Sequence, residues 1–242
     1  MGFIQALNEF FNKYLFNVKW TCQACGREIF DGKYFCDKCL KRLPYNDGAI
    51  CDHCGRKTIS PVDYCTTCSN TLVSFDKARS VFCYEKPISS LIKSFKYDGK
   101  RYLAEVFAHY LSLTYYKNCT PCDIVTFVPM TEKAKKKRGY NQSELLANEF
   151  AKLVSLKVES ILIKEKDTDR QAKLDRKGRL KNLSGAFRVI NRKIIKDKSV
   201  LIVDDVTTTG ATAEVISEKL KKAGAKQVFV LTIASVPPKI KY

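Results

Sequence analysis

The residues of this chain whose types and spacing best suit chemistry lie in the segment VLIVDDVTTTGAT, residues 200–212. An apolar run leads into two adjacent carboxylates, Asp204 and Asp205. A loop of small and hydroxyl-bearing residues then leads into a helical pattern. The first N–H groups of a helix have no partner within it, so such a turn binds anions, and Gly210 lets the backbone approach a phosphate. The carboxylates can accept hydrogen bonds from sugar hydroxyls. These features predict a site for a ribose that carries a 5′-phosphate.

Two other interpretations of this segment remain open. It could be the Walker B strand of a nucleotidase, although the chain contains no G-x-x-x-x-G-K-[ST] motif. It could also be an ordinary strand, turn and helix with two exposed aspartates, which the run of small and hydroxyl residues after the pair disfavours.

The segment resembles the loop that binds 5-phosphoribosyl-1-pyrophosphate (PRPP) in type I phosphoribosyltransferases. The resemblance implies that the acidic pair holds the ribose 2′ and 3′ hydroxyls and that the loop wraps the 5′-phosphate. The PRPP-binding residues that it implies are Asp204, Asp205, Val206, Thr207, Thr208, Thr209, Gly210, Ala211 and Thr212.

Eight of the eleven cysteines form an internal repeat of four CxxC pairs, in which every cysteine recurs after 29 residues and each half opens as C-x-x-C-G-R. Two CxxC turns complete a tetrahedral zinc site without an open position, so two structural zinc ions are predicted. A disulfide framework is the alternative, disfavoured because no export signal is recognised. Pairing within each repeat is the simplest assignment, and interleaved pairing stays open. The expected ligands are Cys22, Cys25, Cys36, Cys39, Cys51, Cys54, Cys65 and Cys68.

The net charge of +18 is unevenly distributed, because residues 133–198 hold 20 Lys/Arg and only 8 Asp/Glu. Such a surplus attracts polyanions such as pyrophosphate or nucleic acid, unless it is only a solvated surface. No apolar run reaches the roughly 18–20 residues that a membrane-spanning helix needs. Residues 1–20 show the spacing of an amphipathic helix, which we expect to pack on the domain that follows.

The remainder of the chain alternates between strand and helix patterns, which predicts an α/β fold with a parallel sheet covered on both faces. We expect three parts: the helix at 1–20, a double zinc-binding module at 21–75 and a phosphoribosyltransferase-like domain at 76–242. Expected strands cover 77–84, 123–128, 158–163, 186–190, 199–203 and 227–234, and expected helices cover 87–95, 101–117, 141–154 and 212–223.

Two further segments extend the resemblance to one family. Val128–Pro129 precedes R-G-Y-N-Q at residues 138–142, and Q-x-x-L, R-x-x-N and G-A-F follow within residues 171–187. With the cysteine repeat and the acidic loop, these motifs resemble the ComF (ComFC) family of bacterial competence proteins, in the same order and over almost the whole chain. The resemblance implies a role in natural transformation and in the handling of single-stranded DNA. It also implies, as partners, a helicase-like protein of the ComF operon and DNA-processing proteins.

We favour a PRPP-binding protein with the phosphoribosyltransferase fold that acts in natural transformation. Three hypotheses remain for its chemistry: an active phosphoribosyltransferase, whose alternative role is nucleotide metabolism, a sensor that binds PRPP without transfer, and a non-catalytic nucleic-acid-binding module. In the first, PRPP binds with Mg²⁺ and an unknown acceptor attacks the ribose. The expected catalytic residues are Asp204, Asp205 and Arg138, and the expected pyrophosphate or flap residues are Lys136, Lys137, Arg138 and Arg179. The expected localisation is cytoplasmic, with peripheral binding at the inner membrane face left open.

Overall fold

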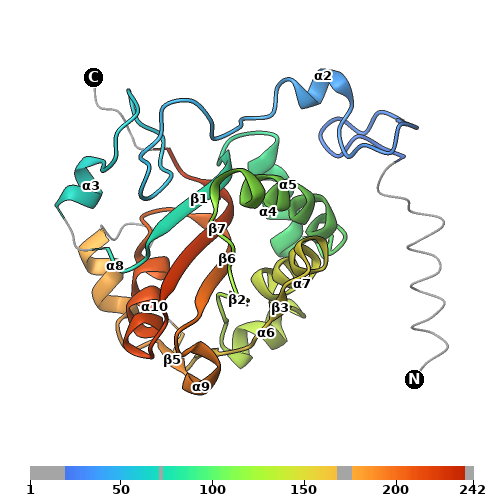
Figure 1. Ribbon diagram of the computed structural model, residues 1–242. Coiled ribbons are helices and arrows are strands. Elements are labelled where there is room, and N and C mark those ends of the chain that lie inside the picture. Colours follow the sequence, from blue (N-terminus) through green and yellow to red (C-terminus); the bar gives the residue numbers. More distant parts are fainter. Residues whose placement is uncertain (1–19, 71–72, 168–175, 238–242) are drawn as a thin grey trace, which may run out of the picture.

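A parallel sheet forms the centre of the computed structural model, which describes residues 20–70, 73–167 and 176–237. Its strand order is β1-β7-β6-β2-β3, and every neighbouring pair is parallel. The strands are β1 (Lys77–Cys83), β2 (Ile124–Phe127), β3 (Lys157–Val158), β6 (Ser199–Thr207) and β7 (Gln227–Ser235). The predicted α/β class with a parallel sheet is therefore confirmed (Figure 1).

Helices cover both faces of this sheet because its central strands are apolar on both sides. In β6, Leu201 and Val203 join one buried cluster, whereas Val200 and Ile202 join the other. The first cluster contains side chains of α4, α5 and α7, and the second contains side chains of α8 and α10. These helices are α4 (Ile88–Tyr97), α5 (Leu103–Asn118), α7 (Gln142–Val154), α8 (Arg176–Leu183) and α10 (Ala211–Lys222).

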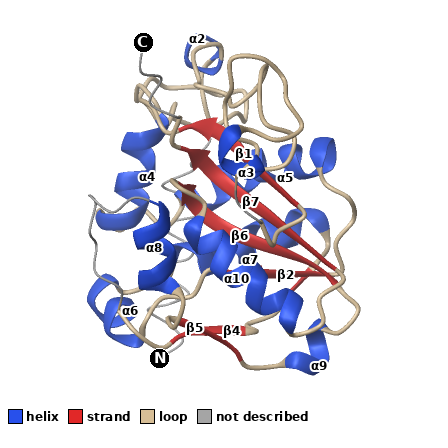
Figure 2. Ribbon diagram, turned by 90° about the vertical axis from the view of Figure 1, so that its left-hand side faces the viewer, coloured by secondary structure: helices blue, strands red, loops and turns tan. Residues whose placement is uncertain are grey.

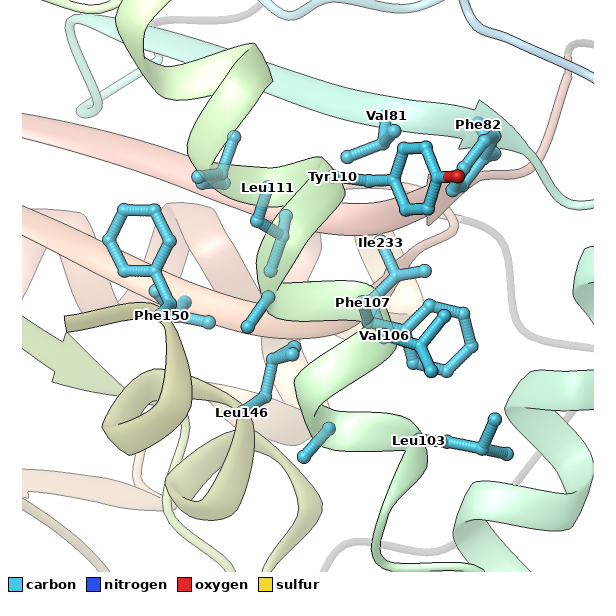
Figure 3. Packing of buried hydrophobic residues seen from close by; sticks show 14 of the residues in the cluster. Val81, Phe82, Leu103, Val106, Phe107, Tyr110, Leu111, Leu146, Phe150 and Ile233 are labelled. Carbon is cyan, nitrogen blue, oxygen red and sulfur yellow. The ribbon is translucent and has the colours of Figure 1, made fainter. Parts of the chain in front are cut away.

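Figure 3 shows part of the first cluster, where side chains of α5 and α7 pack together with Val81 of β1 and Ile233 of β7. Phe107 and Leu111 of α5 and Leu146 and Phe150 of α7 are at most 1% exposed. This packing fixes α7 against the sheet, so the start of α7 lies at a defined place beside the end of β6.

Several local features differ from the prediction, among them helix α8, which was not expected. The expected strand at 158–163 is divided: β3 closes the main sheet, and β4 (Leu162–Lys164) pairs antiparallel with β5 (Phe187–Val189) in a separate small sheet (Figure 2). The lysine-rich segment, for which no element was predicted, forms helix α6 (Glu132–Arg138). A short helix, α9 (Arg192–Ile195), precedes β6.

The cysteine repeat forms two small units, which we call zinc unit 1 (residues 20–43) and zinc unit 2 (residues 50–70). Each contains one helical turn, α2 (Asp37–Leu40) or α3 (Thr66–Ser69), and the two turns lie well apart (Figure 1). Unit 1 packs on α5, where the Tyr34 hydroxyl donates to Glu105 over 2.8 Å. Unit 2 packs on the edge strand β1, where the Ala78 N–H donates to the carbonyl of His53 over 2.8 Å. Among the described residues, no helix is both long and apolar enough to cross a membrane.

Candidate functional site

The acidic pair lies at the carboxyl end of β6, the place where open α/β sheets bind ligands. Asp204 Oδ1 accepts a hydrogen bond from the Ser143 hydroxyl over 2.7 Å and one from the Asp205 N–H over 2.8 Å. Asp205 Oδ1 forms an ion pair with Lys96 Nζ at 2.7 Å. The strand is longer than predicted because β7 continues beside it, with Thr207 paired to Ser235. The pair is therefore held on a strand rather than on a loose turn.

Burial and charge shift the ionisation of this group. Burial, together with the charge of neighbouring Asp205, raises the Asp204 pKa to about 7, although Ser143 and Lys96 oppose the shift. For Lys96, burial lowers the pKa, but attraction to Asp205 and Asp204 outweighs it and the net shift is upward. The charged form of Asp204 is thus costly in the free protein, and a ligand that brings positive charge or hydroxyl donors would relieve that cost.

The loop after the acidic pair forms the turn between a strand and a helix that the sequence predicts. Gly210 lies in the left-handed region with φ of 78°, which favours glycine, and α10 begins at the next residue. The hydroxyl of Thr209 accepts from the Ala211 N–H over 3.4 Å. A cavity of about 30 Å³ lies inside the turn, and most of the predicted PRPP-binding residues line it, namely Asp204, Val206, Thr207, Thr208, Gly210, Ala211 and Thr212.

The R-G-Y-N-Q segment connects β2 to the acidic pair. Asn141 caps α7 by accepting from the Ser143 N–H over 3.1 Å, and its amide group donates to the carbonyl of Val128 over 3.1 Å. These bonds place Ser143 within reach of Asp204. Tyr140 donates a hydrogen bond to the carbonyl of Phe95, next to Lys96. The motif therefore positions both side chains that contact the two carboxylates.

A basic cleft of about 630 Å³ adjoins the acidic pair and shares Lys96 with it. The Arg138 guanidinium lies over the Tyr97 ring at 5.2 Å from its centroid, and Arg101 lies over Tyr140 at 4.7 Å. The residues lining this basic cleft are Lys96, Tyr97, Gly99, Lys133, Ala134, Lys137, Arg138, Tyr140 and Asp167.

The predicted pyrophosphate residues are therefore only partly brought together. Lys137 and Arg138 line the basic cleft, whereas Lys136 is exposed and does not line it. Arg179 belongs to α8, but its side chain lies outside the described part of the chain, as do residues 169–175 of the polar segment at 169–187 that was expected to act as a flap. Lys96 and Ser143 are the contacts that the sequence analysis missed. Ser143 directly follows a recognised motif, whereas Lys96 lies in a segment without a comparable signal.

The cysteine sulfurs gather within each repeat, four in zinc unit 1 and four in zinc unit 2, all within 4.8 Å of one another in each group. The Sγ atoms of Cys25 and Cys36 are 3.9 Å apart, and those of Cys54 and Cys65 are 3.8 Å apart. A tetrahedron with Zn–S bonds of about 2.3 Å has edges of about 3.8 Å, so both groups fit zinc. The hydrogen bond between Cys54 and Cys68 lowers the pKa of the first thiol and raises the pKa of the second, so zinc must displace protons when it binds this group.

Comparison with known proteins finds relatives for both the zinc units and the domain that carries the acidic pair. Residues 14–72 match the family model of a double zinc ribbon domain, and residues 136–241 match that of a phosphoribosyl transferase domain. The chain is 30% identical over 220 residues to "Competence protein F" of Haemophilus influenzae, covering 88% of this chain and 83% of the relative. It is 30% identical over 152 residues to "Competence protein ComFC" of Streptococcus pneumoniae, covering 62% and 64%. It is 29% identical over 153 residues to "DNA utilization protein YhgH" of Escherichia coli K12, covering 61% and 66%.

Proposed function

Because the chain belongs to the ComF family of competence proteins, we propose that it binds PRPP in its phosphoribosyltransferase fold and handles single-stranded DNA during natural transformation. The observation that carries PRPP binding is the acidic pair near the end of β6, followed by a short loop that leads to the left-handed Gly210 and the start of α10. Two neighbouring carboxylates would repel a bare phosphodiester, whereas a sugar phosphate offers hydroxyls to them and a phosphate to the loop.

In this proposal, different groups of residues bind the ribose, the 5′-phosphate and the pyrophosphate of PRPP. Asp204 and Asp205 accept the ribose hydroxyls, and the loop at 207–212 binds the 5′-phosphate through backbone N–H groups and hydroxyls. Lys133, Lys137 and Arg138 of the basic cleft bind the pyrophosphate. The donor set fits Mg²⁺, which binds through one or two carboxylates together with substrate phosphates and adds charge neutralisation to the site. Lys96 neutralises Asp205 while no ligand is bound.

The proposal includes catalysis, namely transfer of the phosphoribosyl group from PRPP to an acceptor. An acceptor nucleophile would attack C1 of the ribose, the bond from C1 to the pyrophosphate oxygen would break, and the electron pair would leave with the pyrophosphate. Cations that lie in fixed positions around the leaving group stabilise that charge, and we assign this role to Arg138. Its guanidinium is held by the Gln142 side-chain oxygen at 2.7 Å, which keeps it at the cleft.

A second function, binding of single-stranded DNA, is supported by the composition of the basic cleft. Single-strand sites combine cations for the backbone with aromatic rings for the bases. The cleft contains three lysines and an arginine, and the Tyr97 ring beside Arg138 is 59% exposed. As part of this proposal, the protein acts in the cytoplasm with the DNA-processing proteins of transformation and a helicase-like protein of the ComF operon.

Calorimetric titration of the zinc-loaded protein with PRPP and Mg²⁺ tests the first function. We expect the Asp204→Asn/Asp205→Asn variant to bind at least about 100-fold more weakly, because each carboxylate loses a charge-assisted hydrogen bond. The control is Glu149→Gln/Glu218→Gln, which removes two charges from surface ion pairs and should bind normally. Absence of binding by the natural protein, or equal binding by the asparagine variant, contradicts PRPP binding.

Fluorescence anisotropy with a labelled oligonucleotide tests the second function. Each phosphate contact on a single strand contributes a slope of about −0.7 to log K against log [salt]. The Lys133→Ala/Lys137→Ala variant should therefore bind more weakly with a slope reduced by about 1.4, whereas Lys152→Ala/Lys222→Ala on distant surface pairs should not change it. An unchanged slope in the cleft variant contradicts a DNA site in the basic cleft.

A further inference from the structure

The two zinc units are repeats in sequence but have different surroundings. Arg27 and Arg56 occupy the same position, directly after the C-x-x-C-G turn. Arg27 is exposed, and its side chain makes no hydrogen bond or ion pair with any described residue. Arg56 is half-buried: its Nη2 donates to the carbonyl of Thr208 over 3.0 Å and its Nη1 to the Thr67 hydroxyl over 3.5 Å. One arginine of the repeat therefore directly contacts the loop at 207–212, which the proposed function assigns to the 5′-phosphate and which we call the phosphate loop.

Zinc unit 2 is fixed against strand β1, close to the contact between Arg56 and Thr208. The Arg79 guanidinium donates to the backbone carbonyl of Asp52 over 2.7 Å, in addition to the bond between Ala78 and His53. A Cβ atom built on Gly55 would lie 2.5 Å from the carbonyl oxygen of Ala78, so the zinc-ligand turn lies directly on the backbone of β1. Arg56 follows that turn, which gives its guanidinium a rigid base.

The segment that leaves zinc unit 2 is bound to the same helix that begins at the loop. Ser74 donates to the Glu214 carboxylate from its N–H, over 3.1 and 3.0 Å to the two oxygens, and from its hydroxyl over 2.7 Å. Glu214 lies in the first turn of α10 and is 8% exposed. The unit therefore contacts both the loop and the helix whose N-terminus the phosphate would approach.

The bond from Arg56 also determines how the loop backbone is oriented. A trans peptide points its C=O and N–H groups in opposite directions, and the bond between Thr208 and Thr209 is trans. Holding the Thr208 carbonyl therefore directs the Thr209 N–H away from Arg56. A cavity of about 20 Å³, lined by Arg56 and Thr67 on one side and by the loop on the other, shows how closely the two surfaces meet.

We propose that Arg56 is a positioning residue for the phosphate loop, so that zinc unit 2 forms part of the PRPP site and zinc unit 1 does not. The choice of PRPP as the ligand rests on the function proposed above. The guanidinium would hold the loop in its binding conformation before the ligand arrives and add a positive charge beside the phosphate. A loop that is only partly in this conformation binds its ligand more weakly in proportion to the lost population.

The test compares Arg56→Met with Arg27→Met in the zinc-loaded, full-length protein. Methionine keeps an apolar stem and removes the hydrogen-bond donors, and two zinc ions per chain verify that both units remain folded. We expect amide hydrogen exchange in peptides that cover residues 203–214 to be about tenfold faster in Arg56→Met without ligand, and PRPP to bind about tenfold more weakly. Arg27→Met should match the natural protein in both measurements. If Arg56→Met loses zinc, Arg56→Leu, which also lacks hydrogen-bond donors, replaces it.

Four results would overturn the proposal: unchanged exchange at residues 203–214 in Arg56→Met, faster exchange there with unchanged PRPP affinity, the same effect from Arg27→Met, or faster exchange confined to zinc unit 2. Failure of the natural protein to bind PRPP would instead contradict the proposed function. In that case the exchange measurement alone still decides whether Arg56 holds the loop, because it is made without ligand. Faster exchange confined to peptides of zinc unit 2 would assign Arg56 to zinc-unit packing.

Discussion

Replacing Asp204 with asparagine should stabilise the protein at alkaline pH, although it removes a proposed ligand-binding group. The pKa of this carboxyl rises from 3.8 to about 7 on folding. Above pH 7 it is charged in both states, and the folded state bears the full cost of that charge. As the pH falls below 7 the folded state takes up a proton while the unfolded state remains ionised, so the cost decreases and disappears near pH 4.

The size of the effect follows from the shift. About three pKa units correspond to about 4 kcal/mol, an upper limit. Asp204 is half-buried, so water screens part of this cost and we expect about 1–2 kcal/mol at pH 8. Asparagine retains a carbonyl oxygen that can accept from Ser143 and from the Asp205 N–H, so the variant should lose few contacts.

Thermal unfolding of both proteins between pH 5.5 and pH 8.5 measures the effect. At pH 8 the variant should unfold about 4 °C higher, and the difference should shrink toward pH 5.5. Both proteins contain the same zinc units, so the loss of zinc at low pH cancels in the comparison. Asp47→Asn, at an exposed position, is the control and should leave the unfolding temperature nearly unchanged. An unfolding temperature for Asp204→Asn that is not raised at pH 8, or a gain independent of pH, would refute the reasoning.

Two other substitutions test the supports of the site. Lys96→Met leaves Asp205 without its cation beside a second carboxylate, so the free energy of unfolding should fall by about 2–3 kcal/mol in urea titrations. Adding Asp205→Asn should restore part of the loss, whereas strictly additive effects of the two substitutions would contradict the pairing. Gly55→Ala and Gly26→Ala share backbone strain, with φ of 66° and 72°, but only the first places a methyl group against the Ala78 carbonyl. We therefore expect Gly55→Ala to lower the free energy of unfolding by about 2 kcal/mol more than Gly26→Ala does. Equal losses in the two variants would contradict the close packing of zinc unit 2 on β1.

Features that short segments of the chain encode could be predicted from the sequence. The alternation of strand and helix patterns predicted the parallel sheet, and the cysteine spacing predicted two groups of four sulfurs. The lysine-rich segment shows a limit of this approach, because no element was predicted there although its local signals favoured a helix. Thr131 caps α6 by accepting from the Ala134 N–H, and Gly139 ends it in the left-handed conformation. Those two positions could have predicted α6.

Other features depend on contacts between distant segments and leave no local pattern. The expected strand at 158–163 has apolar residues on both sides of Glu159 and Ser160, and nothing in this pattern indicates that its first part pairs with β2 and its last part with β5. Lys96 reaches Asp205 across more than a hundred residues of sequence, and Ser143 reaches Asp204 across 61. The roles assigned to the site residues stay predictions, because the geometry brings them together without a ligand.

The zinc repeat shows why a sequence pattern can predict a metal site without predicting what that site supports. Both units contain the same C-x-x-C-G-R turn, and the requirements of zinc for four sulfurs account for its cysteines. Zinc does not require the arginine, whose surroundings depend on which part of the domain lies opposite. In unit 1 that position faces solvent, and in unit 2 it contacts the Thr208 carbonyl. A duplicated unit can therefore keep its metal chemistry in both copies while only one copy contacts the loop that precedes α10.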